Sequence, residues 1–140
     1  MFKLVKYLGG RINHAETREV EVEAIENAIA EGTPVQIKEG AVTPLSQMSN
    51  VVATHMVERG AEAGATELLV SEILPGMIYE APLVNAPDEP MKLWGEYITD
   101  GQKMLTVLAD PEMDMRGAII YDLLGAKVAG DKMLVTFPVV

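Results

Sequence analysis

The stretch that decides the fold is Glu67–Leu83, ELLVSEILPGMIYEAPL. It contains two apolar, β-prone runs joined by Leu74-Pro75-Gly76-Met77. Proline fixes φ at about −65° at the second turn position, and glycine accepts the positive φ that a type II turn requires at the third. Such a turn suits a corner between two packed strands as well as a tight hairpin. In either case the chain reverses here, and we expect both runs in the core.

Further short strands are predicted on both sides of this stretch. Gly32–Leu45 indicates a β-hairpin around Glu39-Gly40. Asp100-Gly101 is a hairpin dipeptide between two further extended runs. The remaining predicted strands are Phe2–Tyr7, Arg18–Glu23, Val51–Val57, Gly117–Leu124 and Lys132–Val140. About eight short strands spaced by about ten residues predict a mainly β fold, a small antiparallel β-barrel or β-sandwich.

Two segments leave alternatives open. Ala24–Glu31 is rich in alanine, with Ile25 and Ile29 four positions apart, and predicts one short helix or a turn; a helix beginning at Ala15 competes with it. The pair Gly9-Gly10 separates residues 1–10 from the rest of the chain. They form either an N-terminal arm that adds to another sheet edge or the first strand of the protein's own sheet. Residues 11–140 then form a single β-rich domain.

Composition excludes several classes of function. A chain of 140 residues predicts one domain, and the absence of cysteine excludes disulfides, thiol catalysis and cysteine metal sites. The net charge of −10 argues against binding to nucleic acid or anionic membranes, which requires a basic face. No apolar run approaches the ~20 residues that cross a bilayer. The start MFKLVKYLGG is too short and broken for a signal peptide, so we expect a soluble protein that is not secreted by this route.

The residue clusters that catalysis requires are missing from the sequence. His14 and His55 are far apart and form no HExxH motif, no serine lies in a GxSxG elbow, and no phosphate-binding glycine loop is present. Asp110, Glu112 and Asp114 alternate like the start of a calcium loop, but the required glycine and distal glutamate are absent. We therefore expect no enzyme activity, no cofactor and no metal, and we interpret Trp94 as a core or interface residue.

Three runs resemble small structural proteins of tailed bacteriophages: Ala30–Leu45 (AEGTPVQIKEGAVTPL), Ala65–Leu83 (ATELLVSEILPGMIYEAPL) and Val128–Val139 (VAGDKMLVTFPV). The nearest group is the lambda-type head decoration, or capsid cement, family. The resemblance implies a β-rich protein that sits as a trimer on the outer capsid surface and clamps neighbouring coat subunits. The lambda-type protein is shorter and starts with an irregular polar arm, whereas this chain starts with an apolar strand.

The resemblance sets the functional expectations. We expect a homotrimer, made in the host cytoplasm, that binds the major capsid protein and stabilises the head in the virion. The predicted capsid-binding arm residues are Phe2, Leu4, Val5 and Tyr7, and the predicted oligomer-interface residues are Trp94, Met77 and Tyr79. The alternative function is that of a tail-tube, head–tail joining or other virion structural protein. A small β-barrel enzyme is a third hypothesis.

Overall fold

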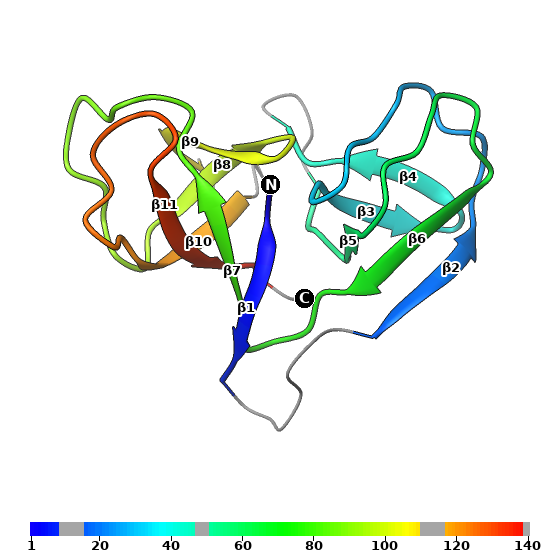
Figure 1. Cartoon of the computed structure of the whole chain (residues 1–140), viewed down its shortest axis with the longest axis horizontal. Coiled ribbons are helices and arrows are strands. Elements are labelled where there is room, and N and C mark those ends of the chain that lie inside the picture. Colours follow the sequence, from blue (N-terminus) through cyan, green and yellow to red (C-terminus); the bar gives the residue numbers. More distant parts are fainter. Residues whose placement is uncertain (9–15, 47–50, 110–116, 139–140) are drawn as a thin grey trace.

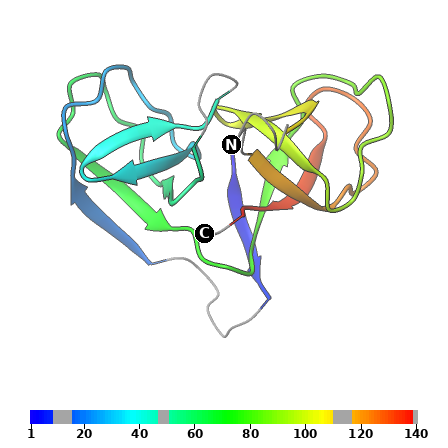
Figure 2. The same cartoon turned by 180° about the vertical axis from the view of Figure 1, so that it is seen from behind.

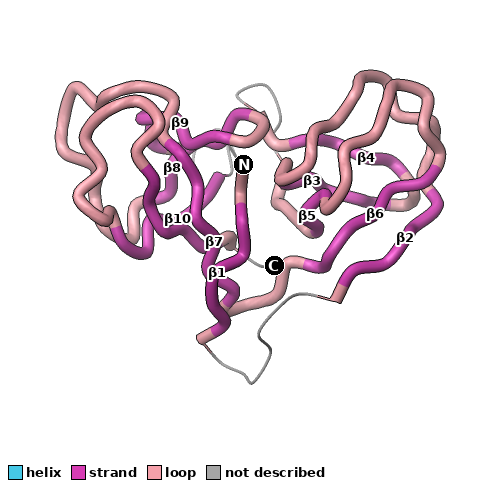
Figure 3. The backbone as a smooth tube through the Cα atoms, viewed as in Figure 1, coloured by secondary structure: helices cyan, strands magenta, loops and turns pink. Residues whose placement is uncertain are grey.

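The computed structural model describes residues 1–8, 16–46, 51–109 and 117–138, and this part of the chain consists of strands and loops without a helix (Figure 3). Its strands are β1 (Lys3–Tyr7), β2 (Thr17–Glu21), β3 (Pro34–Lys38), β4 (Ala41–Pro44), β5 (His55–Val57), β6 (Glu67–Glu72), β7 (Met77–Pro82), β8 (Glu96–Asp100), β9 (Lys103–Leu108), β10 (Gly117–Asp122) and β11 (Lys132–Thr136). The mainly β prediction is confirmed.

The strands form two antiparallel sheets. Sheet A has six strands in the order β1-β7-β11-β10-β8-β9, and sheet B has five in the order β2-β6-β5-β3-β4. Each sheet keeps two edge strands, so neither closes into a barrel. Figure 1 shows the sheets as two lobes that lie side by side, and Figure 2 shows the same division from behind.

The stretch that decides the fold is a corner between the sheets. β6 belongs to sheet B and β7 to sheet A, so the chain crosses from one lobe to the other through Leu74-Pro75-Gly76 (Figure 1). Gly76 has φ of 86°, and the Met77 amide donates to the Leu74 carbonyl at 3.3 Å. A positive φ at this position is the reason for glycine after proline. The turn geometry predicted from the sequence therefore joins two sheets instead of forming a hairpin.

Two clusters of buried hydrophobic side chains form the core of the protein. The smaller cluster lies in the sheet B lobe and includes Val35, Val57, Leu68 and Val70. The larger lies under sheet A but also takes in side chains from the sheet B lobe, namely Leu45, Ala53, Met56 and Ile73. Because one hydrophobic cluster receives residues from both sheets, apolar burial joins the two lobes.

The short helix predicted at Ala24–Glu31 is wrong. Ile25 donates its amide to the Ala65 carbonyl at 3.0 Å, and Ile29 exchanges two hydrogen bonds with Ala61. The backbone of this segment therefore bonds across to residues 61–65 and not along a helix, which places both isoleucines in the sheet B core. Alanine favours helix by only a few tenths of a kcal/mol per residue over most residues, and tertiary burial outweighs that preference. The competing helix from Ala15 is also not seen, because Thr17–Glu21 forms β2.

The N-terminal segment is the first strand of the protein's own sheet. β1 pairs with β7 along Lys3–Tyr7, with an irregularity between Leu4 and Lys6. Phe2 is only 2% exposed and packs against Phe137 with ring centroids 5.3 Å apart. Gly9-Gly10 lies outside the described residues. Of the two alternatives for residues 1–10, the structure places residues 3–7 in a strand and not in a free arm.

Candidate interaction surface

The candidate site lies on the outer face of sheet A. Ile120 of β10 is fully buried, so alternation along the strand turns its neighbour Tyr121 toward the other face. The loop before β8 is fixed to the same strand, since Trp94 donates its amide to the Ile120 carbonyl at 2.8 Å and Ile120 donates to the Gly95 carbonyl at 3.0 Å. These two hydrogen bonds hold Trp94 beside Tyr121.

Three side chains stack on this face. The rings of Trp94 and Tyr121 meet edge to face with centroids 5.7 Å apart and an interplanar angle of 87°. The Lys6 Nζ, from β1, lies 4.7 Å from the centroid of the Tyr121 ring. A cation over an aromatic ring at this distance contributes roughly 0.5–1 kcal/mol at an exposed site. We call Lys6, Trp94 and Tyr121 the aromatic–lysine face.

Trp94 is unusual in two respects. Its side chain is 65% exposed, the most exposed large hydrophobic residue in the described part of the chain. Its backbone φ is 63°, in the left-handed region, which costs a bulky residue on the order of 1–2 kcal/mol. A strained, exposed indole gains nothing from burial in a single copy. Features of this kind concentrate at binding sites, where the surroundings of a partner repay the cost.

Charges beside the aromatic–lysine face are largely basic or already paired. Lys3 lies opposite Glu80 in the β1–β7 register, and Lys132 Nζ is 3.3 Å from the Glu80 carboxylate. Glu80 is therefore paired with Lys132 and lies across the strand pairing from Lys3. The ammonium group of Lys6 rests on a ring and has no carboxylate partner among the ion pairs of the described residues.

Of the predicted interface residues, only Trp94 reaches the surface. Met77 and Tyr79 are 2% and 1% exposed and belong to the core under sheet A. The Tyr79 hydroxyl donates to the Met77 sulfur at 3.5 Å, and burial raises the pKa of Tyr79 above its usual range. Both residues lie on the side of β7 that faces this core, where the Tyr79 ring packs edge to face against Phe137 with centroids 5.4 Å apart. They offer no surface to a partner.

The predicted arm residues divide in the same way. Phe2 is buried, and Leu4 and Tyr7 pack half-buried against the core. Only Val5, at the irregularity in the β1–β7 pairing, is exposed, at 43%. Because Phe2 is buried and β1 pairs with β7, these residues contribute to the stability of the fold itself.

Sequence reasoning missed Lys6 and Tyr121. They come from β1 and β10, which are separated in sheet A by β7 and β11. No local pattern brings these strands together, so no sequence signal identified the pair.

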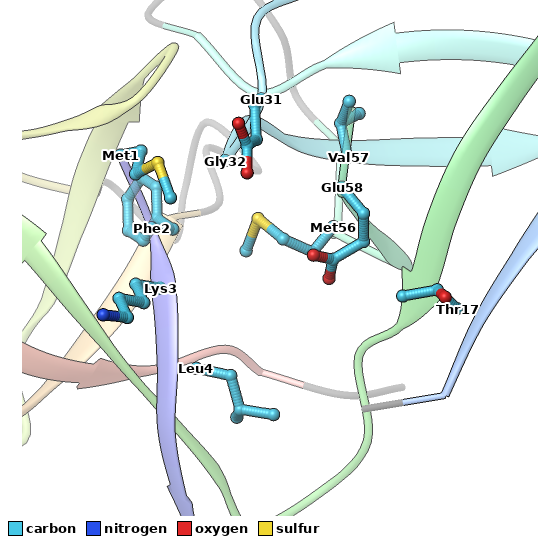
Figure 4. Close-up of a pocket in the computed structure, with 10 residues that line it drawn as sticks. All are labelled: Met1, Phe2, Lys3, Leu4, Thr17, Glu31, Gly32, Met56, Val57 and Glu58. Atoms are coloured by element: carbon cyan, nitrogen blue, oxygen red, sulfur yellow. The ribbon is translucent and has the colours of Figure 1, made fainter. Parts of the chain in front are cut away.

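A hollow between the lobes is a second candidate for a binding site (Figure 4). It has a volume of about 390 Å³ and is lined by Met1, Phe2, Lys3, Leu4, Thr17, Glu31, Gly32, Met56, Val57 and Glu58. The Glu58 carboxylate already accepts a hydrogen bond from the Ser71 hydroxyl. Phe2 donates its amide to the Gly32 carbonyl at 3.0 Å across the hollow's edge. We therefore interpret the hollow as a gap at the contact between the two lobes and not as a binding site.

His55, the one histidine among the described residues, belongs to no group of side chains placed to hold a metal ion. The His55 Nδ1 lies 2.7 Å from the Thr54 hydroxyl oxygen, and burial lowers the pKa of His55. His14 and the acidic run Asp110, Glu112 and Asp114 lie outside the described residues. Within residues 1–8, 16–46, 51–109 and 117–138, no group of three or more histidine or acidic side chains is placed to hold a metal ion.

Comparison with known proteins adds no identity to these observations. No family model matches the chain, and no curated protein is significantly similar to it. In the part of the chain that the structure describes, no helix is long and apolar enough to cross a membrane.

Proposed function

We propose that this chain is an interaction protein of a tailed-phage head, a decoration protein that stabilises the capsid by binding the coat protein. The observation that carries the proposal is the aromatic–lysine face, where a strained, 65% exposed Trp94 stands on a sheet whose other side is the protein's core. A large apolar side chain rigidly held at the surface is the usual anchor of a protein interface. The phage assignment rests on the resemblance of three runs of the sequence to the lambda-type family.

The test is binding to shells. The protein is mixed with capsids assembled from the coat protein encoded in the same genome, and bound and free chains are separated by sedimentation. We expect saturable binding and a higher melting temperature of the decorated shells. Failure of the folded protein to sediment with these shells would refute the decoration role.

A matched pair of variants tests the face itself. Trp94→Ala removes the anchor, and we expect it to lower shell binding by at least tenfold, because truncating an interface anchor costs roughly 2 kcal/mol or more. Val128→Ala is the control, since Val128 is an exposed apolar residue outside the aromatic–lysine face. Equal binding by the two variants would remove this face from the proposal.

One observation favours the tail-tube or connector alternative. Among the residues that the structure describes, four strands lie at sheet edges: β1 and β9 in sheet A, and β2 and β4 in sheet B. Free sheet edges suit rings and tubes in which neighbouring subunits continue each other's sheets. A stable ring of six or twelve copies in solution would support this alternative over a decoration trimer.

A further inference from the structure

The outer side of β9 is covered only near the start of the strand. β9 stands last in the order of sheet A, with no further strand beyond it in the described part of the chain (Figure 1). The Val84 amide donates to the Met104 carbonyl at 2.9 Å, and Leu83 forms a parallel bridge with Met104. Among the described residues no such bridge continues beyond Met104, so residues 106–108 keep an open edge.

The backbone of Leu108 faces this open side. Leu108 is paired with Tyr97 of β8, and the next residue, Ala109, donates its amide to the Glu96 carbonyl at 2.8 Å. Hydrogen-bonded and non-hydrogen-bonded positions alternate in an antiparallel pair, so the N–H and C=O of Leu108 point away from β8. Neither group is bonded to another segment within the described residues. A strand added to the sheet would use these groups.

A groove borders the open edge of β9. It has a volume of about 380 Å³ and lies between residues 106–108 on one side and residues 88–92 on the other. Val107 and Leu108 are 56% and 46% exposed. Lys92 donates its amide to the Tyr97 hydroxyl at 2.8 Å, which holds the far wall to β8. We call this hollow the β9 groove.

The form of the β9 groove decides what kind of segment fits it. One wall is the edge of a strand and the other is a loop, so the groove admits a single extended segment. The edge of a second folded sheet is a poor fit, because its own neighbouring strand would meet the loop. The exposed side chains of Val107 and Leu108 favour apolar residues in the occupant.

Charge narrows the choice of occupant further. Asp88 and Glu89 line the β9 groove and are exposed, whereas Lys92 is the one cation that lines it in the described part of the chain. The whole chain carries a net charge of −10. A negative surface attracts basic partners and disfavours acidic ones. The occupant that matches the groove therefore carries lysine or arginine among its apolar residues.

We propose that the β9 groove binds an extended segment of another protein, in which apolar and basic residues alternate, as a further strand of sheet A beside β9. The backbone of Leu108 supplies hydrogen bonds to this strand, and Asp88 and Glu89 attract its basic side chains. The inference goes beyond the proposed function, because it uses a surface different from the aromatic–lysine face.

The probe is a short synthetic peptide, blocked at both ends, in which lysine alternates with valine and threonine. Its fluorescence anisotropy is measured while the full-length protein is added, and we expect saturable binding. One analogue carries glutamate in place of lysine. A second keeps the side chains but is N-methylated at every second amide, which removes the donors of one strand edge. Both analogues should bind at least tenfold more weakly than the probe.

A matched pair of proline variants tests the edge itself. Leu108→Pro removes the outward amide of β9 and should weaken binding of the probe at least tenfold, although an edge strand tolerates proline at such a position. Glu21→Pro is the control. Glu21 lies in the edge strand β2, where the Val22 amide donates to the Thr66 carbonyl at 2.9 Å, so the Glu21 amide also points outward. This variant should bind the probe as the wild type does, and circular dichroism checks that both variants fold.

A second pair tests the charge of the groove. Asp88→Lys with Glu89→Lys should weaken binding of the lysine peptide at least tenfold and favour the glutamate analogue. Glu26→Lys with Glu62→Lys makes the same change in net charge at exposed positions of the sheet B lobe. This control should leave the preference for the lysine peptide unchanged.

Three outcomes would overturn the inference. One is the absence of saturable binding to the wild-type protein, and another is equal binding by Leu108→Pro and Glu21→Pro. The third is a wild-type mass in solution above that of one 15.2 kDa chain which Leu108→Pro reduces to that of a single chain, since a second copy would then occupy the groove. Trp94→Ala should bind the peptide as the wild type does, so failure of the proposed shell binding is a separate result.

Discussion

At the scale of single residues, the described part of the chain leaves one buried side-chain polar atom without a hydrogen-bond partner, the hydroxyl of Thr99. Thr99 is fully buried in β8 opposite Met104, which is also fully buried. Burying a hydroxyl without a hydrogen bond costs roughly 1–3 kcal/mol. Thr99→Val keeps the shape and removes this cost, so we expect it to raise the free energy of unfolding by about 1 kcal/mol in urea titrations.

The control for this substitution is Thr99→Ser, which keeps the hydroxyl and loses a methyl group. It should destabilise by about 1 kcal/mol because it leaves a small cavity. A valine variant less stable than the wild type would mean that the hydroxyl is satisfied.

His55 makes stability depend on pH. Burial lowers the pKa of His55, Glu72 opposes the shift and Arg18 adds to it. The unfolded chain, with an ordinary pKa of about 6.5, binds this proton more readily than the folded protein. Neutral His55 therefore makes its full contribution to stability above about pH 6.5. This contribution is lost as the pH falls from there toward the lowered pKa of the folded state.

Urea unfolding at about pH 8 and about pH 5 tests this prediction. The midpoint of the wild-type protein should fall on acidification, and His55→Gln, which does not titrate, should show a smaller fall. An equal fall in both proteins would assign the pH dependence to other groups.

At the scale of elements, Gly117 decides how closely β10 and β8 approach. A Cβ atom at this position would lie 1.8 Å from the Tyr97 carbonyl oxygen and 2.6 Å from its carbon. Backbone atoms cannot move aside as a flexible side chain can, so Gly117→Ala must separate the two strands. It should also disturb the hydrogen bond from the Gly117 amide to the Glu96 carboxylate, which is 3.0 Å long.

We expect Gly117→Ala to lower the free energy of unfolding by about 3 kcal/mol or more, near the upper end of single substitutions. Gly60→Ala is the matched control, because its nearest atom, the Ile29 carbonyl oxygen, would be 3.6 Å from the new Cβ. The control should change stability by less than about 0.5 kcal/mol. Similar midpoints for both variants would contradict the close approach of β8 and β10.

Elements fixed by local chemistry were predictable from the sequence. The hairpin at Glu39-Gly40 joins β3 and β4, and both turn residues have positive φ, 52° and 83°. The segment Ala24–Glu31 was not predictable, because its hydrogen-bond partners at residues 61–65 are distant in sequence. The same limit applies to the candidate site, where Trp94 was named but Lys6 and Tyr121 depend on the strand order of sheet A.

At the scale of the whole molecule, the question is whether two sheets side by side behave as one folding unit. The sequence predicted one β-rich domain but gave no signal that β6 and β7 lie in different sheets, since a type II turn suits a hairpin or a corner. The larger core cluster holds Phe2, Tyr79 and Phe137 together with Met56 and Ile73 of the sheet B lobe. Cooperative unfolding of both lobes follows from this shared burial.

Phe2 is the residue through which that coupling can be tested. Its ring packs on Phe137 of the sheet A lobe, while its amide donates to the Gly32 carbonyl of the sheet B lobe. Phe2→Ala should cost about 3–5 kcal/mol, as for other buried phenylalanines. Trp94 fluorescence reports on sheet A, and far-ultraviolet circular dichroism reports on both sheets. If the lobes unfold together, both signals should shift to the same lower urea midpoint.

Val5→Ala, at an exposed position of the same strand, should leave both midpoints nearly unchanged. Two separated transitions in the wild-type protein would show instead that the shared cluster is too weak to make the lobes one unit.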